Sequence, residues 1–123
     1  MPSLNHTKFP GKVRSGEKLT TIRALRKRLI RKGDRLYHYS GMRTKRCRLL
    51  RVTTCVDVCT ILILRPRGSF GRYQVILNGR NLPDQAIRAI AAMDGFRFCS
   101  DFIEYFCPPG CKEAFFGQWI MWS

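Results

Sequence analysis

The stretch CRLLRVTTCVDVCTILIL, residues 47–64, is the longest strand-like segment in this chain of 123 residues. Its β-branched residues favour an extended backbone, and apolar side chains alternate with polar ones along its first part. The alternation sets Leu50, Val52, Val56 and Val58 against Arg51, Thr53 and Asp57. The segment therefore predicts one long strand and a fold that contains a β-sheet.

Shorter elements are predicted on both sides of this strand. Further strands are expected at residues 20–22, 35–40, 73–77 and 117–122. A helical turn is expected at residues 9–15, one helix from Pro83 to Gly95, and another after Ser100, which can cap it. About five strands and two or three short helices make an α+β fold or a small β-barrel, in one domain over residues 1–123.

The composition limits the class of protein. Hydrophobic residues make up 45% of the chain, which favours a packed core over disorder. No apolar run has the length of a membrane-spanning helix, and the opening MPSLNHTKFP lacks the apolar centre of a secretory signal. We therefore expect a cytoplasmic protein with no membrane partner.

Positive charge is concentrated in the first part of the chain. The whole sequence holds 23 Lys and Arg against 8 Asp and Glu, a net charge of +15. Residues 1–51 alone hold 16 basic and 2 acidic residues, a net charge of +14. A basic face of this kind usually binds a polyanion, so RNA is the expected partner. The alternatives are a surface that serves solubility and a surface that binds an acidic protein.

The cysteines allow more than one interpretation. The chain contains Cys47, Cys55, Cys59, Cys99, Cys107 and Cys111. Without a secretory signal, reduced thiols are the default. The pairs Cys55-x3-Cys59 and Cys107-x3-Cys111 have the spacing of zinc half-sites, but the first pair lies in a predicted strand, where a metal knuckle does not form. We expect neither a metal site nor a cofactor.

The segment GEKLTTIR, residues 16–23, is the candidate for chemistry. A threonine hydroxyl is a weak nucleophile unless a base takes its proton, and a lysine with a lowered pKa can be that base. Lys18 and Thr21 lie three residues apart, so they converge only if the chain bends after Gly16. Without that bend, the segment is an edge strand that contacts phosphates. Asp94 lies on the inner face of the predicted helix, where it can approach this segment or simply turn the chain at Asp-Gly.

Three motifs together resemble the ASCH family of small PUA-like β-barrels. They are the G-x-K-x-x-T-x-R pattern of residues 16–23, KGDRLYHYSGMRTKRCR at residues 32–48, and AAMDGF at residues 91–96. The resemblance covers about residues 8–122, and the sequence of these motifs is similar to that of ASCH proteins from bacteriophages and prophages. It implies a PUA-like barrel with a cleft that binds RNA.

The resemblance also implies a catalytic alternative. One bacterial branch of the family is an amidohydrolase that removes the acetyl group from N4-acetylcytidine with a lysine, a threonine and a glutamate. By position these would be Lys18, Thr21 and Asp94, although Asp94 is one methylene shorter than the family's glutamate. Another branch is described as cleaving RNA, so a ribonuclease is a further alternative.

The expected RNA contacts follow from charge and from exposed aromatic residues. We predict phosphate contacts from Lys18, Arg23, Arg26, Lys27, Arg28, Arg43, Lys45 and Arg46. In RLYHYS, residues 35–40, alternation sets Leu36 and His38 against Tyr37 and Tyr39, so Tyr37 or Tyr39 could stack on a base or pack on the strand. His38 is predicted to be packed or solvated and not catalytic. The expected partner is RNA or a nucleoside bound to a monomer, and the alternative is an acidic host protein.

Overall fold

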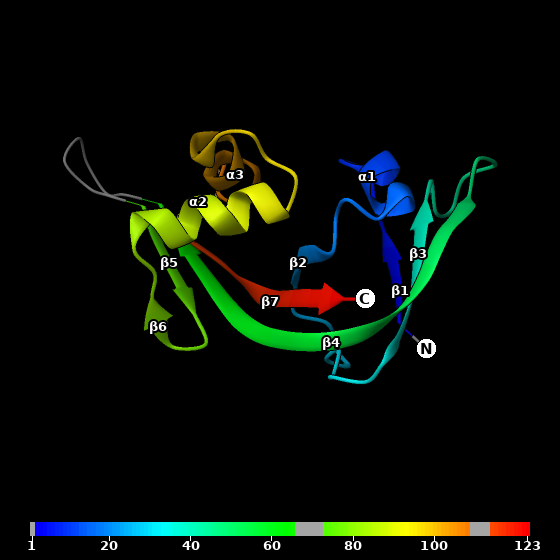
Figure 1. Cartoon of the computed structure of the whole chain (residues 1–123), viewed down its shortest axis with the longest axis horizontal. Coiled ribbons are helices and arrows are strands. Elements are labelled where there is room, and N and C mark those ends of the chain that lie inside the picture. Colours follow the sequence, from blue (N-terminus) through cyan, green and yellow to red (C-terminus); the bar gives the residue numbers. More distant parts are fainter. Residues whose placement is uncertain (1, 66–72, 109–113) are drawn as a thin grey trace.

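The computed structural model describes residues 2–65, 73–108 and 114–123 (Figure 1). Its elements in chain order are β1 (Ser3–Asn5), α1 (Pro10–Ser15), β2 (Thr20–Ala24), β3 (Arg35–Ser40), β4 (Arg48–Leu64), β5 (Gln74–Leu77), β6 (Arg80–Asn81), α2 (Asp84–Met93), α3 (Cys99–Phe106) and β7 (Ala114–Trp122). The strands form one seven-stranded sheet, so the fold is mixed α+β, as the sequence predicts.

The long strand β4 organises the sheet. Its first half pairs antiparallel with β3, its second half pairs antiparallel with β7, and its end also pairs with β5. Figure 1 shows β4 as a strongly curved ribbon that runs the length of the molecule. The remaining pairs are β1 with β3, which is parallel, β2 with β7, and β5 with β6. Two of the strands, β1 and β6, were not predicted, because three and two residues are too few to show a pattern.

The predicted faces of β4 are only partly correct: Leu50 and Val58 pack against the smaller core cluster and Arg51 and Asp57 are exposed, but Val52 and Thr53 are exchanged. The buried side chains are Thr53, Cys55, Ile61 and Ile63, whereas Val52 is 40% exposed. Thr53 is buried because its hydroxyl has a buried hydrogen-bond partner, and a register shift between Cys55 and Asp57 interrupts the regular pairing with β7. Burial on this strand therefore follows the packing of other elements and not the local alternation.

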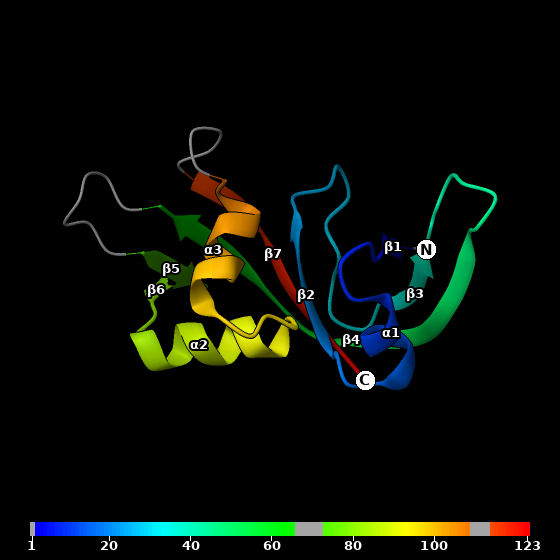
Figure 2. The same cartoon turned by 90° about the horizontal axis from the view of Figure 1, so that it is seen from above.

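Two apolar clusters lie on the sheet, one at each end. The larger cluster lies between the second half of β4 and helices α2 and α3, with Ile61, Ile63, Phe102 and Ile103 at its centre. The smaller cluster includes Val13 of α1 and packs against the other part of the sheet. In Figure 2, α1 is seen at one end and α2 with α3 at the other, with β2 between them. Strand β2 therefore lies where residues from both ends can meet.

The helices differ from the prediction in one detail. The residue that caps α3 is Phe98, not Ser100, and no side chain caps that helix. Phe98 has an extended backbone and directly precedes the first helical residue, Cys99. The helix therefore begins earlier than a cap at Ser100 would allow. None of the helices in the described residues is long and apolar enough to cross a membrane.

Gly117 allows β2 to approach β7 closely, and this contact gives the first prediction. Gly117 pairs with Ala24, and a Cβ at this position would overlap the carbonyl oxygen of Arg23. We expect Gly117→Ala to lower the free energy of unfolding by about 1–3 kcal/mol, because backbone atoms cannot move aside as a flexible side chain can. Urea denaturation measures this change.

The matched control is Gly11→Ala in α1. A Cβ at Gly11 would have no atom within 4 Å, and alanine favours a helix over glycine by about 1 kcal/mol. The control should therefore leave the protein equally stable or slightly more stable. Equal unfolding free energies for the two variants would contradict the close approach of β2 to β7.

Candidate functional site

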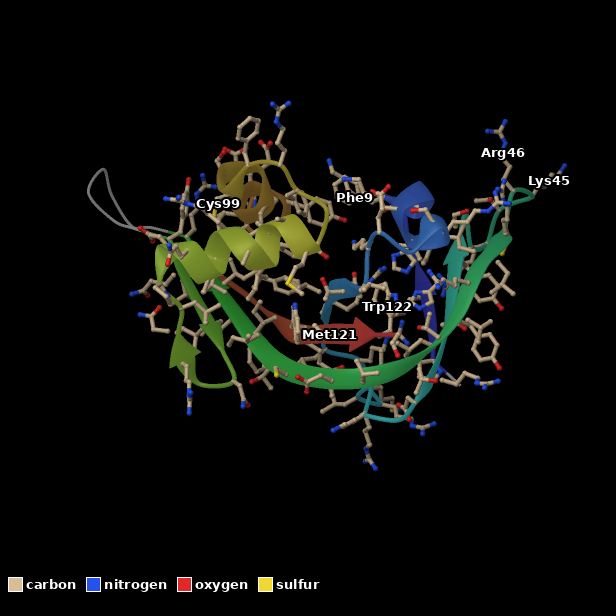
Figure 3. All side chains as sticks on the ribbon, viewed as in Figure 1. Phe9, Lys45, Arg46, Cys99, Met121 and Trp122 are labelled. Atoms are coloured by element: carbon tan, nitrogen blue, oxygen red, sulfur yellow. The ribbon has the colours of Figure 1, made fainter. Side chains whose placement is uncertain are left out.

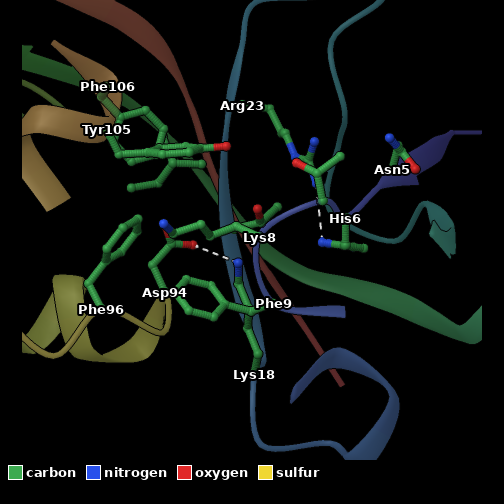
Figure 4. A pocket seen from close by; sticks show the side chains of 13 residues that line it. Asn5, His6, Lys8, Phe9, Lys18, Arg23, Asp94, Phe96, Tyr105 and Phe106 are labelled. Atoms are coloured by element: carbon green, nitrogen blue, oxygen red, sulfur yellow. Dashed lines mark hydrogen bonds and ion pairs between the residues drawn. The ribbon is translucent and has the colours of Figure 1, made fainter. Parts of the chain in front are cut away.

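A polar pocket lies where β2 faces both ends of the sheet (Figure 4). The N-terminal segment 5–9, the residues of β2, the end of α2 and helix α3 all contribute to its wall. Its polar side chains include His6, Lys8, Lys18, Thr21, Arg23 and Asp94. Its aromatic side chains are Phe9, Phe96, Tyr105 and Phe106. The pocket therefore gathers the motif at residues 16–23 and the carboxylate of the AAMDGF turn.

Lys18 and Asp94 form a buried ion pair at the centre of the pocket. Lys18 Nζ lies 3.2 Å from Asp94 Oδ1, and the two residues are only 6% and 3% exposed. Figure 4 shows the lysine side chain reaching across the pocket to the carboxylate. Asp94 is held at the C-terminal end of α2 by its own N–H, which donates to the carbonyl of Ile90. Lys18 is the only residue within ion-pair distance of a carboxylate in the described part of the chain.

Burial sets the protonation of this pair. It raises the pKa of Asp94 from 3.8 to about 6, and Lys18 and Arg23 oppose this rise. It also lowers the pKa of Lys18, which the neighbouring carboxylate partly restores. Burial therefore shifts both groups of the pair towards their neutral forms, compared with the same groups in water.

The raised pKa of Asp94 predicts a specific pH dependence of stability. Between pH values near 4 and 6, the folded state holds a proton on Asp94 that the unfolded state has lost. The free energy of unfolding should therefore fall as pH rises through this window, by on the order of 3 kcal/mol, and level off above it. In Asp94→Asn this component should be absent. Urea denaturation of both proteins across the window measures the difference, and parallel curves would contradict it.

The chain bends after Gly16, as convergence of the motif requires. Gly16 has a left-handed backbone with φ of 86°, and β2 begins only at Thr20. Lys18 therefore precedes the regular strand, and its N–H donates to the carbonyl of Lys12 at 2.9 Å. Thr21 follows within the strand, is 3% exposed and lines the same pocket. Strand alternation does not separate the two residues, because only one of them belongs to the strand.

A buried hydrogen-bonded chain leads from the pocket into the interior. Arg23 Nη2 lies 3.2 Å from His6 Nδ1, and His6 Nε2 lies 2.9 Å from His38 Nδ1. His38 Nε2 then lies 2.7 Å from Thr53 Oγ1. His6 is 3% exposed and His38 is fully buried, and both rings pack against Trp122.

This series of hydrogen bonds, from Arg23 through His6 and His38 to Thr53, was not predicted from the sequence. The parallel pairing of β1 with β3 places Leu4 beside His38, so His6 follows directly at the end of the short strand. Burial is the main reason that the pKa of His6 falls to about 2 and that of His38 to about 4, with Arg23 as the next cause. Both rings are therefore neutral. His38 is packed, as predicted, and does not line the pocket.

The predicted basic residues lie in three places. Lys18 and Arg23 line the pocket. Lys27 and Arg28 lie in an open groove on the loop between β2 and β3, with Arg31 and Lys32 beside them. This loop is fixed by Gln118 of β7, whose side-chain amide makes two hydrogen bonds to the backbone of Ile30. Arg26 differs from its neighbours, because its guanidinium donates to the carbonyl of Ser3.

The third place is the turn between β3 and β4. Arg43, Lys45 and Arg46 are exposed there, and Figure 3 shows Lys45 and Arg46 at the tip of that turn, pointing away from the molecule. The structure therefore does not gather all the predicted phosphate contacts in one cleft. Tyr37 and Tyr39 are half-buried on β3 and line neither the pocket nor the groove.

Cys47, Cys55, Cys59 and Cys99 are free thiols. Cys55 is buried, as is Cys107, whereas Cys59 and Cys99 are half-buried and Cys47 is exposed. Cys111 lies outside the described residues. Within residues 2–65, 73–108 and 114–123, no three His, Cys, Asp or Glu side chains are grouped as metal ligands.

No family model matches this sequence, and no curated protein or solved structure matches it significantly. The ASCH resemblance therefore stays a prediction that rests on three sequence motifs.

Proposed function

We propose that this protein is an RNA-binding member of the ASCH family, in which strongly curved β4 forms the wall of a PUA-like barrel. The observation that carries the proposal is the meeting of Lys18, Thr21, Arg23 and Asp94 in one pocket. These residues come from distant parts of the chain, and the resemblance names the same positions. RNA binding also agrees with the excess of basic residues in residues 1–51.

The basic loop supports contact with the sugar–phosphate backbone. The groove beside it has a volume of about 540 Å³, and Lys27, Arg28, Arg31 and Lys32 lie along it. A backbone that is fixed by Gln118 presents these side chains from a defined position, which lowers the entropy lost on binding. Phosphate contacts of this kind position RNA without reading its sequence.

A nucleobase fits beside the pocket and not inside it. The pocket itself has a volume of about 40 Å³, which is room for a few water molecules. An open groove of about 330 Å³ adjoins it, and Ile22, Arg23, Tyr105 and Phe106 line both spaces. Tyr105 is 48% exposed there, so its ring offers a face on which a base can stack. A small substituent of that base would then enter the polar pocket.

Amide hydrolysis is the second candidate, and the Lys18–Asp94 contact favours it. In the reaction, neutral Lys18 takes the proton of the Thr21 hydroxyl as the oxygen attacks the carbonyl carbon of an N-acetyl group. The C–N bond then breaks, the leaving nitrogen receives a proton from the lysine or from Asp94, and water hydrolyses the acetyl-threonine ester to acetate. A carboxyl pKa of about 6 suits a group that both gives and takes a proton near neutrality.

The shorter side chain of Asp94 does not prevent this arrangement. The resemblance implies a glutamate at this position, and a reach that is shorter by about 1 Å can cost on the order of a hundredfold in rate. In this protein Asp94 Oδ1 nevertheless lies 3.2 Å from Lys18 Nζ. The carboxylate therefore still reaches the lysine.

One incubation separates these proposals. The purified protein is mixed with two single-stranded RNAs of one sequence, with and without N4-acetylcytidine, and binding, acetate release and strand length are followed together. Binding of both RNAs supports the RNA-binding proposal, and acetate release adds hydrolysis to it. Strand cleavage would favour a ribonuclease instead. If neither RNA binds even at low salt, the RNA-binding proposal is wrong.

A further inference from the structure

Arg23 lines the pocket without an ion-pair partner among the described residues. Its guanidinium is partly buried, and its Nε is a buried atom without a hydrogen-bond partner. Its Nη2 donates a hydrogen bond to the neutral imidazole of His6, and no carboxylate in the described residues lies within ion-pair distance of it. Removing a cation from water without a counter-charge is costly, so such a site is usually completed by an anion.

The order of the hydrogen bonds fixes the protonation of both histidines. A guanidinium can only donate, so His6 Nδ1 must accept from Arg23, and the ring proton of His6 must lie on Nε2. His6 therefore donates to His38 Nδ1, and His38 carries its own proton on Nε2 and donates to Thr53 Oγ1. In each of these three hydrogen bonds the donor is therefore the residue nearer the pocket, and the acceptor is the residue nearer the interior.

These hydrogen bonds hold the Arg23 guanidinium in place without neutralising its positive charge. A carboxylate at the position of His6 would fix Arg23 equally well, but it would also cancel its charge. The neutral imidazole supplies an acceptor and leaves the full positive charge facing the pocket. Figure 4 shows Arg23 and His6 side by side, with the phenol of Tyr105 pointing towards them from α3.

The rest of the pocket adds positive charge. Lys8, Lys18 and Arg23 line it, whereas Asp94 is the acidic residue among its lining side chains. Asp94 is in contact with Lys18, so it acts on Arg23 only as a more distant charge and not as an ion-pair partner. The pocket therefore carries an excess of cationic groups on the side of β2 that also faces the groove of Tyr105.

We infer that Arg23 forms a phosphate subsite next to the proposed base-binding groove, and that His6, His38 and Thr53 are positioning residues for its guanidinium. The inference rests on the proposed function and narrows its ligand to a nucleotide that carries a phosphate, in place of a free nucleoside. The planar fork of a guanidinium matches two oxygens of a phosphate, which a lysine ammonium does not.

Titration calorimetry with defined probes tests the subsite. The probes are cytidine, cytidine 3′-monophosphate, cytidine 5′-monophosphate, the dinucleotide CpC and inorganic phosphate. The wild-type protein should bind the phosphorylated cytidines about tenfold or more tightly than cytidine. Preference for a monophosphate over CpC would identify a terminal phosphate, and preference for CpC would identify an internal phosphodiester. Equal affinity for cytidine and all its phosphorylated forms would overturn the inference.

Variants assign this preference to Arg23. Arg23→Gln should abolish the preference, measured as the ratio of the affinities for phosphorylated cytidine and cytidine, and Arg23→Lys should restore only part of it because the fork is lost. Lys8→Gln removes one charge from the same pocket and should retain most of the preference. If Arg23→Gln and Lys8→Gln lower it equally, the pocket acts through general charge and the subsite is wrong.

The positioning role has its own spectroscopic test. Nitrogen-15 NMR of the ring nitrogens should show a proton on Nε2 of both His6 and His38, at neutral pH and without ligand. Thr53→Val should disturb the His38 signal and weaken the phosphate preference, while the affinity for cytidine stays constant. A proton on Nδ1 of His6 would contradict the assigned hydrogen bonds and with them the positioning role of His6, His38 and Thr53. If RNA does not bind but these tautomers and phosphate binding are found, the RNA-binding proposal fails and the subsite survives.

Discussion

Replacing Thr21 with valine should abolish amide hydrolysis and leave RNA affinity almost unchanged. Valine keeps the branched shape of a side chain that is 3% exposed, so the packing of β2 is preserved. The hydroxyl is the nucleophile that attacks the amide carbonyl in the proposed mechanism, so its loss should lower the rate by about a thousandfold or more. Acetate release from RNA containing N4-acetylcytidine measures the rate, and a binding titration of the same RNA measures the affinity.

Two further variants sharpen this test. Thr20→Val changes the neighbouring threonine, which is fully buried, and should leave the rate within a few-fold of the wild type. Asp94→Glu restores the carboxylate that the ASCH resemblance implies, and it should raise the rate if the missing methylene is the limitation. Hydrolysis that survives Thr21→Val would show that another group attacks the substrate, and the catalytic proposal would then fail.

Replacing Lys27 and Arg28 together with alanine should weaken RNA binding and reduce its salt dependence. Both side chains are exposed on the loop that Gln118 fixes, and neither makes an ion pair within residues 2–65, 73–108 and 114–123. Each phosphate contact in single-stranded RNA contributes about 0.7 to the slope of log affinity against log salt. The double variant should therefore lower that slope by about 1.4. Arg26 is left unchanged, because its bond to the Ser3 carbonyl gives it a structural role.

The matched control removes the same charge from the other part of the chain. Arg80 and Arg88 are exposed on β6 and α2, outside the basic segment of residues 1–51. Arg80→Ala with Arg88→Ala should leave the salt slope within error of the wild type. If both double variants flatten the slope equally, RNA binds through overall charge and not through the loop between β2 and β3.

Local pattern predicted most of the elements but not how they pair. The 17 residues of β4 and the ten residues of α2 show their periodicity in the sequence itself. The parallel pairing of β1 with β3 joins residues more than 30 positions apart, and β1 is too short to show a period. The burial of Thr53 on β4 was also not predicted, because it accompanies a hydrogen bond to His38 on the neighbouring strand β3.

The candidate site was predicted only as far as its motifs extend. Lys18, Thr21 and Asp94 were expected together, and they line one pocket. His6 and Tyr105 were missed, because each reaches the pocket through long-range packing that leaves no mark in the neighbouring sequence. The sequence contained one signal for the histidines, because it has just two, His6 and His38. The structure joins these two by a buried hydrogen bond. Tyr37 and Tyr39 were considered for stacking because of their alternation, but Tyr105 is the tyrosine that lines the pocket.

The proposal that a nucleotide of bound RNA sits beside this pocket can be tested by photo-crosslinking. A single-stranded RNA with 4-thiouridine is crosslinked to the intact protein, and the modified residues are located by mass spectrometry. We expect adducts at Tyr105 and Phe9, because these aromatic side chains line the pocket that the base faces. Tyr105→Ala should remove the adduct at that position. Adducts confined to residues 25–33 and 41–47, and unchanged in Tyr105→Ala, would contradict the proposal and leave only backbone binding by the basic surface.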